Sequence, residues 1–453
     1  MTQQLAARQD YTAGSIHRNI WILGLPMTIE MAMASLTFTV DTFWVGRLGS
    51  AALAALTISV TIRWVISSLS SGLGVGGLAL VARRIGERDR EAADHATAQV
   101  VLLGIGISLL LGAAGILMAE PLLRLMGADA EVLPLGLSFL RITFGGLFTL
   151  VMIYMINALL RGAGEARRAM QVLILSNTLT ILLEPLLIFG LGTLPGLGVS
   201  GSAWATVLGA GSGVVFQMII LLRHRAHIGI SLRDLKPDFP LMWRIIRIAL
   251  PSTVQMVLRS SSRLVILGIV GLYGTFATAG YGVANRILII ALIPGFGLGN
   301  AASTLVGQNL GAGQPGRAER SAWWVTAYNA ALMAVMTALF LAFARPLVAF
   351  FDPTPQVVDI GANALRIIAP SLIASAVGIV LGRSFAGAGD TVPPMAVNLL
   401  TLWGLEAPLA YGLARWTKLG ISGVWAGRAI ANLANGLLFV AWFRLGRWKR
   451  KKV

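Results

Sequence analysis

The sequence predicts an all-α polytopic membrane protein with twelve transmembrane helices in two parallel-repeat six-helix bundles. Three observations predict this fold class. Hydrophobic residues make up 56% of the 453 residues and charged residues only 12%, whereas a soluble domain has about 25% charged residues. Apolar stretches of about 20 residues, long enough to span a bilayer, recur along the chain. One pattern also occurs twice, in residues 24–100 and 249–325, with an offset of 225 residues.

The repeat continues beyond this first pair of segments. Its members are mainly glycines and prolines, and the pairs are Leu25-Pro26 and Leu250-Pro251, Gly46 and Gly271, Gly49 and Gly274, Gly72 and Gly297, Gly74 and Gly299, Gly162-Ala-Gly164 and Gly387-Ala-Gly389, and, after a slip of three residues, Leu197–Gly201 and Leu419–Gly423. A duplicated half of about 220 residues in such an apolar chain is typical of transporters, in which two similar bundles rock against each other.

The twelve expected helices are separated by clusters of charged residues, glycine and proline. They lie near residues 18–44, 51–82, 96–119, 132–160, 169–191, 200–222, 243–271, 276–310, 322–345, 357–382, 393–414 and 420–443. Six helices per half is an even number, so both copies should share one orientation in the membrane. We expect a lobe at 1–222, a cytoplasmic linker at 223–242, and a second lobe with a basic tail at 243–453.

The positive charges predict the orientation. Of the 36 lysines and arginines, 24 lie in the termini and the loops on their side, and five lie in the opposite loops. The positive-inside rule then places both termini in the cytoplasm, in a cell (inner) membrane. The net charge of +17 is therefore explained by topology and lipid headgroups rather than by nucleic acid. The N-terminus is polar for too long to be a cleavable signal peptide. We expect a monomer.

Several chemistries are disfavoured. The chain has no cysteine and four histidines, His17, His95, His224 and His227, all in predicted loops or at helix ends. Disulfides and thiolate metal sites are thus excluded, and a histidine metal site is disfavoured. A membrane enzyme such as a prenyl transferase would need an Asp-rich metal-diphosphate motif or a His/Asp pair at membrane depth. The sequence has neither, so we expect no enzyme and no cofactor.

Charged residues inside predicted helices are the functional candidates, because ionisable groups at membrane depth are costly. The acids are Glu30, Asp41, Glu184 and Glu406, and the bases are Arg63, Arg141, Arg259, Arg263, Arg286, Arg366 and Arg428. Asp41 and Glu184 lie at similar depths in two helices of one lobe. Two such carboxylates can share a proton or hold a small cation, as a proton- or sodium-driven carrier requires. The alternative is that each pairs with an arginine, or that Asp41 caps a helix end.

The other candidates leave alternatives open. Glu30 lies eleven residues before Asp41, on nearly the same helix face and about 16 Å deeper; it either extends a polar path or forms a structural pair. Glu406 lies near the repeat-related position of Glu184. Arg259 and Arg263 are one turn apart and either bind an anionic substrate or neutralise Glu406, the interpretation we favour. The other five arginines are interpreted as structural or snorkelling.

Proline early in the first helix of each bundle is a further candidate. Pro26 and Pro251 occupy repeat-related positions, and proline removes a backbone hydrogen bond and permits a kink. Pro26 is therefore either a hinge or a static kink.

Several stretches together resemble one family. They are GLPMTIEMAMASLTFTVDTFWVGRLGSAALAALTIS (24–59), LLEPLLIFGLG (182–192), LGVSGSAWATV (197–207) and VGQNLGAGQPGRAER (306–320). The chain is similar to the multidrug and toxic compound extrusion (MATE) family of cation-coupled antiporters, in its DinF-like branch. The resemblance implies a MATE/MOP-type fold of two six-helix lobes. It also implies efflux of small organic, often cationic, compounds in exchange for H+ or Na+ by alternating access.

The resemblance also implies a coupling site in the N-terminal lobe. The branch's first-helix aspartate falls at Asp41, a fifth-helix aspartate at Glu184, an asparagine one turn earlier at Thr180, and a sixth-helix threonine at Thr206. The substitutions at 180 and 184 favour H+ slightly over Na+. The main alternative is a lipid or lipid-linked oligosaccharide flippase of the same superfamily, with a basic cavity formed by Arg63, Arg259, Arg263 and Arg286.

Overall fold

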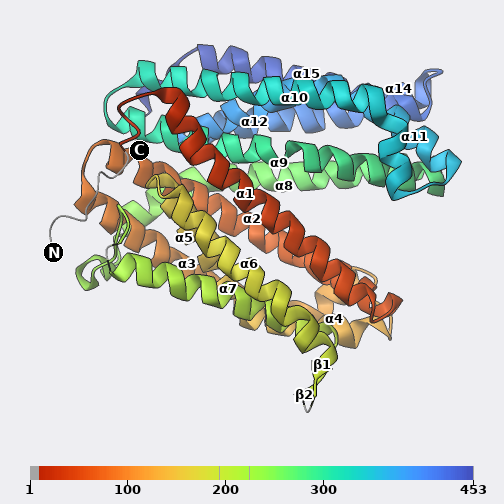
Figure 1. The fold of residues 1–453 in the computed structure, drawn as a ribbon, viewed down its shortest axis with the longest axis horizontal. Helices are drawn as coiled ribbons and strands as arrows, with labels where there is room; N and C mark the ends of the chain where they lie inside the picture. The colour runs from red at the N-terminus through yellow and green to blue at the C-terminus, as the bar shows by residue number, and fades with distance from the viewer. Residues whose placement is uncertain (1–9, 193, 224, 452–453) are drawn as a thin grey trace. The chain divides into compact units, whose positions relative to one another are not determined.

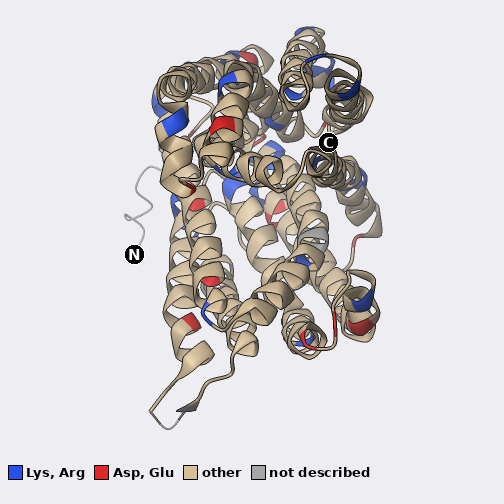
Figure 2. Cartoon of the chain, turned by 90° about the vertical axis from the view of Figure 1, so that its right-hand side faces the viewer, with Lys and Arg blue, Asp and Glu red and all other residues tan. Residues whose placement is uncertain are grey.

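The computed structural model describes residues 10–192, 194–223 and 225–451, and the predicted loop residue His224 lies outside them. The described chain is almost entirely helical (Figure 1), and charged residues are sparse along its helices (Figure 2). Ten helices are long and apolar enough to cross a membrane, and one bent pair makes an eleventh. The predicted class, an all-α multi-pass membrane protein, is therefore confirmed.

The helices form two compact units. One is built on Ile29–Leu250, and the other on Tyr11–Thr28 together with Pro251–Val453. Two helices, α1 (Ile16–Gly46) and α8 (Phe239–Gly271), therefore contribute residues to both units. The boundary between the units lies within α8, which begins before its predicted start at residue 243.

The first unit contains the remaining helices of the N-terminal half. They are α2 (Ser50–Gly86), α3 (Arg90–Leu125), α4 (Val132–Gly145), α5 (Leu147–Gly162), α6 (Ala166–Phe189) and α7 (Val199–Leu222), with a hairpin of β1 (Gly190–Leu191) and β2 (Leu194–Pro195) and a 3-10 helix at Leu232–Leu235. The antiparallel hairpin pairs Gly190 with Pro195 and Leu191 with Leu194. It was not predicted, because two-residue strands leave no alternating pattern in a sequence.

One predicted helix of this unit, 132–160, is bent. Its two parts, α4 and α5, meet at an angle of 53°. The bend lies at Gly146, whose backbone leaves the helical region (φ −91°, ψ 10°). A Cβ atom at Gly146 would lie 2.4 Å from a methyl group of Val207. Only glycine therefore fits where the bend approaches α7.

The second unit contains the helices of the C-terminal half. They are α9 (Thr275–Gly311), α10 (Pro315–Phe351), α11 (Pro355–Ile368), α12 (Leu372–Gly387), α13 (Val392–Asn398), α14 (Ala407–Trp416) and α15 (Ile421–Arg444), with 3-10 turns at Ala369–Ser371 and Arg447–Arg450 and a π-helical segment at Leu399–Glu406. The predicted helix 393–414 thus consists of three short pieces, which explains why it is not among the ten long spans. The predicted helix 357–382 changes to 3-10 geometry around Pro370, which has no N–H to donate.

Repeated glycines have the same conformation in both units. Gly49 and Gly274 have φ values of 110° and 92° and directly precede α2 and α9. Gly198 and Gly420, with φ values of 57° and 53°, directly precede α7 and α15. Residues with a Cβ atom rarely adopt these positive φ values. The duplicated sequence therefore preserves the same helix starts in both units.

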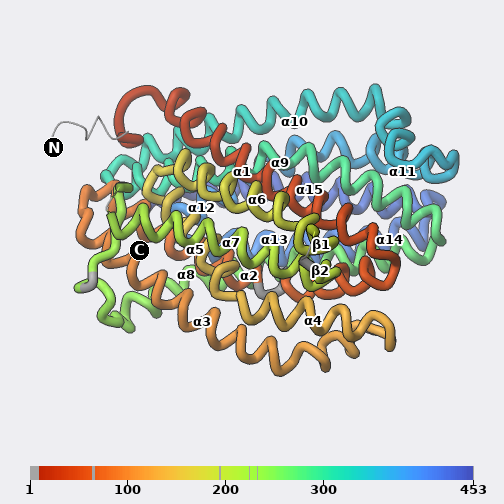
Figure 3. Tube along the Cα trace, turned by 60° about the horizontal axis from the view of Figure 1, so that its bottom comes forward, coloured from red at the N-terminus to blue at the C-terminus, as the bar shows by residue number. Residues whose placement is uncertain are grey.

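A second repeated pair permits close helix packing. A Cβ atom at Gly201 in α7 would lie 2.3 Å from the carbonyl oxygen of Leu187 in α6, and one at Gly423 in α15 would lie 2.5 Å from the carbonyl carbon of Leu413 in α14. Small residues at helix interfaces bring backbones together where lipid surrounds the protein. The motif at 197–201 and 419–423 thus starts a helix and packs it on the preceding one, as the neighbouring paths of α6 and α7 show (Figure 3).

The segment before α8 is hydrogen-bonded to α3 through the buried side chain of Gln99. The Nε2 atom of Gln99 donates hydrogen bonds to the carbonyl oxygens of Asp234 and Lys236, both at 2.9 Å. Its Oε1 atom accepts one from the N–H of Asp238, also at 2.9 Å. Most of the predicted linker 223–242 is therefore ordered against the first unit.

A second set of contacts holds the start of this segment. Glu165 accepts hydrogen bonds from the N–H of His227 at 3.1 Å and forms a 2.8 Å contact with its Nδ1 atom. Burial alone would raise the pKa of Glu165, but the bonds to His227 and the charge of Arg168 hold it below its usual value. The carboxylate is therefore charged near neutral pH, and its attachment to His227 persists there.

We predict that Gly201→Ala lowers the unfolding temperature in detergent, because the added methyl group meets backbone atoms that cannot rotate away. Overpacking of this kind costs about 1–3 kcal/mol. The control is Gly211→Ala on the same helix, where the nearest atom would be 3.6 Å away. Equal unfolding temperatures for the two variants would contradict the close approach of α6 and α7.

We further predict that Gln99→Ala accelerates amide hydrogen exchange in residues 226–238. It removes three hydrogen bonds, each with a net value of about 1 kcal/mol. Hydrogen exchange with mass spectrometry measures the change. Gln356→Ala, an exposed glutamine in α11, should leave the exchange of this segment unaltered. Unchanged exchange in Gln99→Ala would show that the attachment does not depend on Gln99.

Candidate functional site

The first unit buries two carboxylates that the sequence singled out. Asp41 in α1 is 4% exposed and Glu184 in α6 is 0% exposed. The charges of the two groups act on each other, and Arg63 in α2 lies within electrostatic range of both. The structure thus brings Asp41 and Glu184 into one electrostatic cluster. It adds Arg63, which sequence analysis had treated as structural or snorkelling.

Asp41 is held by a hydroxyl group from another helix. The Oγ atom of Ser202 in α7 donates a hydrogen bond of 2.5 Å to Oδ1 of Asp41, and both side chains are buried. Sequence analysis missed Ser202. The available signal was its position one turn before Thr206, in the same stretch LGVSGSAWATV.

Glu184 is in a different situation. Both of its carboxylate oxygens are buried, and neither accepts a hydrogen bond from any residue that the structure describes. A buried carboxylate without donors is costly in its charged form. Uptake of a proton or a small cation at Glu184 would remove much of this cost.

The two threonines implied by the resemblance lie in α6 and α7. Thr180, one turn before Glu184, is buried, and its hydroxyl donates to the carbonyl oxygen of Ser176 at 3.0 Å. A Cβ atom at Gly209 in α7 would lie 2.0 Å from this hydroxyl oxygen. Thr206 in α7 is half-buried and has no hydrogen bond to the described part of the chain. Both threonines stay predictions as ion ligands.

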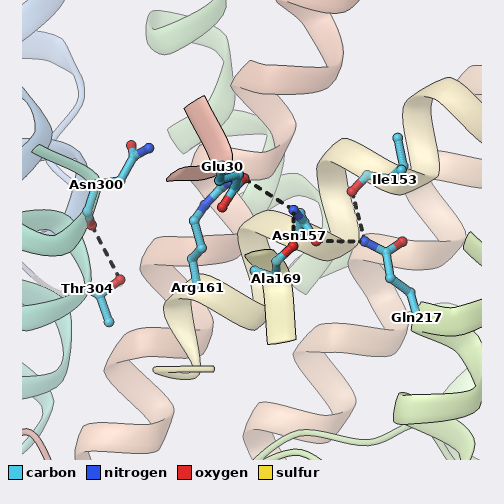
Figure 4. A network of polar contacts seen from close by, with 8 residues as sticks. All are labelled: Glu30, Ile153, Asn157, Arg161, Ala169, Gln217, Asn300 and Thr304. Carbon is cyan, nitrogen blue, oxygen red and sulfur yellow. Dashed lines mark hydrogen bonds and ion pairs between the residues drawn. The ribbon is translucent and has the colours of Figure 1, made fainter. Parts of the chain in front are cut away.

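Glu30 belongs to a separate polar network in the first unit (Figure 4). Its Oε1 atom accepts hydrogen bonds from Arg161, with which it forms an ion pair, and from Asn157 at 3.2 Å. Gln217 in turn donates to Asn157 at 2.9 Å and to the carbonyl oxygen of Ile153 at 3.0 Å. Glu30 is therefore paired with Arg161, and its role in a polar path stays a prediction.

In the second unit, Glu406 pairs with Arg428, which was not predicted to be its partner. The Nε atom of Arg428 lies 3.9 Å from Oε1 of Glu406, and Ser262 donates to Oε2 at 3.4 Å. Arg263 is within electrostatic range of Glu406, and Arg259 instead contacts Asn398. The direct ion-pair partner of Glu406 is thus Arg428, rather than the favoured pair of Arg259 and Arg263.

Pro26 lies inside α1, which runs without interruption from Ile16 to Gly46. Its side chain is buried in the second unit. A hinge at this proline stays a prediction.

We predict that Glu30→Gln and Arg161→Met each destabilise the protein, because each leaves a buried charge without its partner. Such losses amount to about 3–5 kcal/mol. The double variant should be more stable than the sum of the single losses implies. Thermal unfolding measures all three, with Glu120→Gln, from the exposed pair with Arg124, as the control. Strict additivity would show that the two charges are not coupled.

An all-helical, apolar chain with matching glycine motifs in two units defines a duplicated membrane transporter. The comparison with protein families makes this specific. The MatE family model matches the chain twice, over residues 26–186 and 251–412. The protein belongs to this family, and the two matches confirm the internal repeat.

Individual relatives cover the whole chain. The probable multidrug resistance protein YoeA of Bacillus subtilis is 26% identical over 100% of this chain and 98% of its own. An FAD transporter of Shewanella oneidensis is 27% identical over 95% of both chains. The crystal structure of MATE in the straight conformation matches with a TM-score of 0.91 and 27% identity, over 97% of this chain and 98% of that one. The protein is thus a membrane transporter of small molecules and not an enzyme.

Proposed function

We propose that the protein is a secondary antiporter that exports small organic compounds in exchange for H+ or Na+, with Asp41 and Glu184 as the coupling site. The observation that carries this proposal is the buried, hydrogen-bond-free carboxylate of Glu184 within electrostatic range of Asp41. The name of the Bacillus subtilis relative, a probable multidrug resistance protein, supports the export of drug-like compounds.

The proposed coupling between ion and drug binding follows from the free-energy cost of burying these charges. Two carboxylates and one nearby arginine leave one negative charge in an apolar surrounding, where charge is expensive. A proton or cation that binds between Asp41 and Glu184 cancels that charge. Because ion binding and drug binding then favour different states of the protein, each weakens the other through linkage. Alternation between two open states, with Pro26 as the hinge, completes the exchange cycle.

We favour H+ over Na+ as the coupling ion. Protonation needs only the carboxylates, whereas a sodium ion would also use hydroxyl oxygens such as those of Thr180, Thr206 and Ser202. The Ser202 hydroxyl already donates to Asp41, and that of Thr180 donates to a backbone carbonyl. These donated bonds leave the lone pairs of both oxygens free, so the preference for H+ rests on the residues that stand at 180 and 184, a threonine and a glutamate.

The distribution of positive charge supports a placement in the cell (inner) membrane with both termini in the cytoplasm. The arginine and lysine residues at 447, 449, 450 and 451 lie at the C-terminal end, and Arg223 and Arg225 lie in the segment between α7 and α8. We also propose that the monomer is the transporting species, since one chain supplies both repeats.

We predict that the purified protein in right-side-out proteoliposomes exports a fluorescent organic cation when an inward proton gradient is applied. Asp41→Asn and Glu184→Gln should reduce this export to the level of protein-free liposomes, because each leaves one carboxylate beside Arg63 and the site then has no net charge for an ion to cancel. Glu120→Gln, at an exposed acid in α3, is the matched control. The same assay with an inward sodium gradient identifies the ion. Full gradient-driven export by both variants would falsify the proposed coupling site.

A second candidate is a flippase for a lipid or lipid-linked oligosaccharide. It is favoured by Arg259 and Arg263, which have no ion-pair partner among the described residues. A fluorescent anionic lipid in the same vesicles, bleached from outside with dithionite, distinguishes the two functions. Protein-dependent loss of the protected half of the signal, without export of any organic cation, would support the flippase.

A further inference from the structure

Two neighbouring arginines of α8 form no ion pair with any acid that the structure describes. Arg259 and Arg263 lie one turn apart in α8, and Arg259 is partly exposed while Arg263 is exposed. No Asp or Glu that the structure describes forms an ion pair with either. The one hydrogen bond of Arg259 to a described side chain is a 3.4 Å contact of Nη2 with Oδ1 of Asn398. Their positive charges are therefore available to a ligand.

The surrounding charges make this arrangement costly. Arg259 lies within electrostatic range of Arg263 and of Arg383 in α12, and like charges one turn apart destabilise a helix. Among the described residues, the acid within electrostatic range of Arg263 is Glu406, and it already forms an ion pair with Arg428. The arginines Arg259, Arg263 and Arg428 thus lie near one acid, so a bound anion would stabilise the cluster.

The backbone beside these arginines departs from regular α-helix. The π-helical segment Leu399–Glu406 begins directly after Asn398, the partner of Arg259, and ends at Glu406. Trp403 within it donates to the carbonyl oxygen of Leu258 at 3.3 Å, which ties it to α8. π-helical turns are rare in proteins, but many of those that occur lie at functional sites. This segment is independent support for a site beside Arg259.

We propose that Arg259 and Arg263 bind an anionic group of the transported compound, a phosphate or a carboxylate. The guanidinium group offers planar, paired donors that match both anions. An arginine at membrane depth usually faces a water-filled cavity or the bundle interior rather than lipid. The exposed side chain of Arg263 would reach a ligand in such a cavity. This inference rests on the proposed transport function and specifies the substrate class, which then includes anions and zwitterions as well as cations.

The test uses matched fluorescent compounds and the purified protein in lipid nanodiscs. Riboflavin and riboflavin 5′-phosphate differ by one phosphate, and fluorescein and its methyl ester differ by one carboxylate. We expect wild type to bind at least one acid about tenfold more tightly than its partner, the factor that one charge-assisted hydrogen bond supplies. Arg259→Gln and Arg263→Gln should abolish this preference. Arg366→Gln, at an exposed arginine of α11, should retain it.

Further arms separate the possible outcomes. Nanodiscs with anionic instead of zwitterionic lipid show whether a headgroup with a net negative charge competes for the arginines. Weaker binding of the acid in anionic lipid would support an anion site at the arginines and identify a lipid headgroup as its ligand. Arg259→Lys keeps the charge and guards against loss of folding. No preference for either acid in wild type, or a preference that survives both glutamine substitutions, overturns the inference. Because this binding needs no ion gradient, it is independent of whether Asp41→Asn abolishes transport.

Discussion

The high cost of an unpaired polar group in an apolar surrounding governs this structure. The backbone avoids this cost by forming helices, in which its N–H and C=O groups bond to each other. The side chains meet it by pairing: Glu30 with Arg161, Glu406 with Arg428, and Asp41 with Ser202. Among the described residues, the buried carboxylate of Glu184 accepts no hydrogen bond, and Arg259 and Arg263 form no ion pair with an acid. We propose that an ion binds at the first position and an anionic group at the second.

The two units share a backbone plan but not a charge balance. The first has two acids and one arginine in its electrostatic cluster, whereas the second has Arg259, Arg263 and Arg428 near one acid. Duplication therefore supplied two equivalent scaffolds whose buried charges differ in sign. A carrier of this kind can assign the coupling ion to one unit and part of the substrate to the other.

The sequence alone predicted the helical class, the repeat and the family, because apolar spans and duplicated glycines are local features. It also identified Asp41 and Glu184, since acids at membrane depth are rare. The sequence could not identify which residues pair with these acids. Ser202 and Arg428 are ordinary residues in the sequence, and only the packing of α7 on α1 and of α15 on the π-helical segment makes them partners of acids. The bend at Gly146 and the π-helical segment likewise depend on contacts between distant residues.

Two helices, α1 and α8, have their first turns in one unit and their remaining turns in the other. They occupy equivalent places in the two repeats, so this exchange is reciprocal. If each repeat descends from a separate half-length chain, two such chains would have assembled as a domain-swapped dimer, each lending the start of its first helix to its partner. Under that condition, each half-length chain would have had a complete helix bundle only in the dimer.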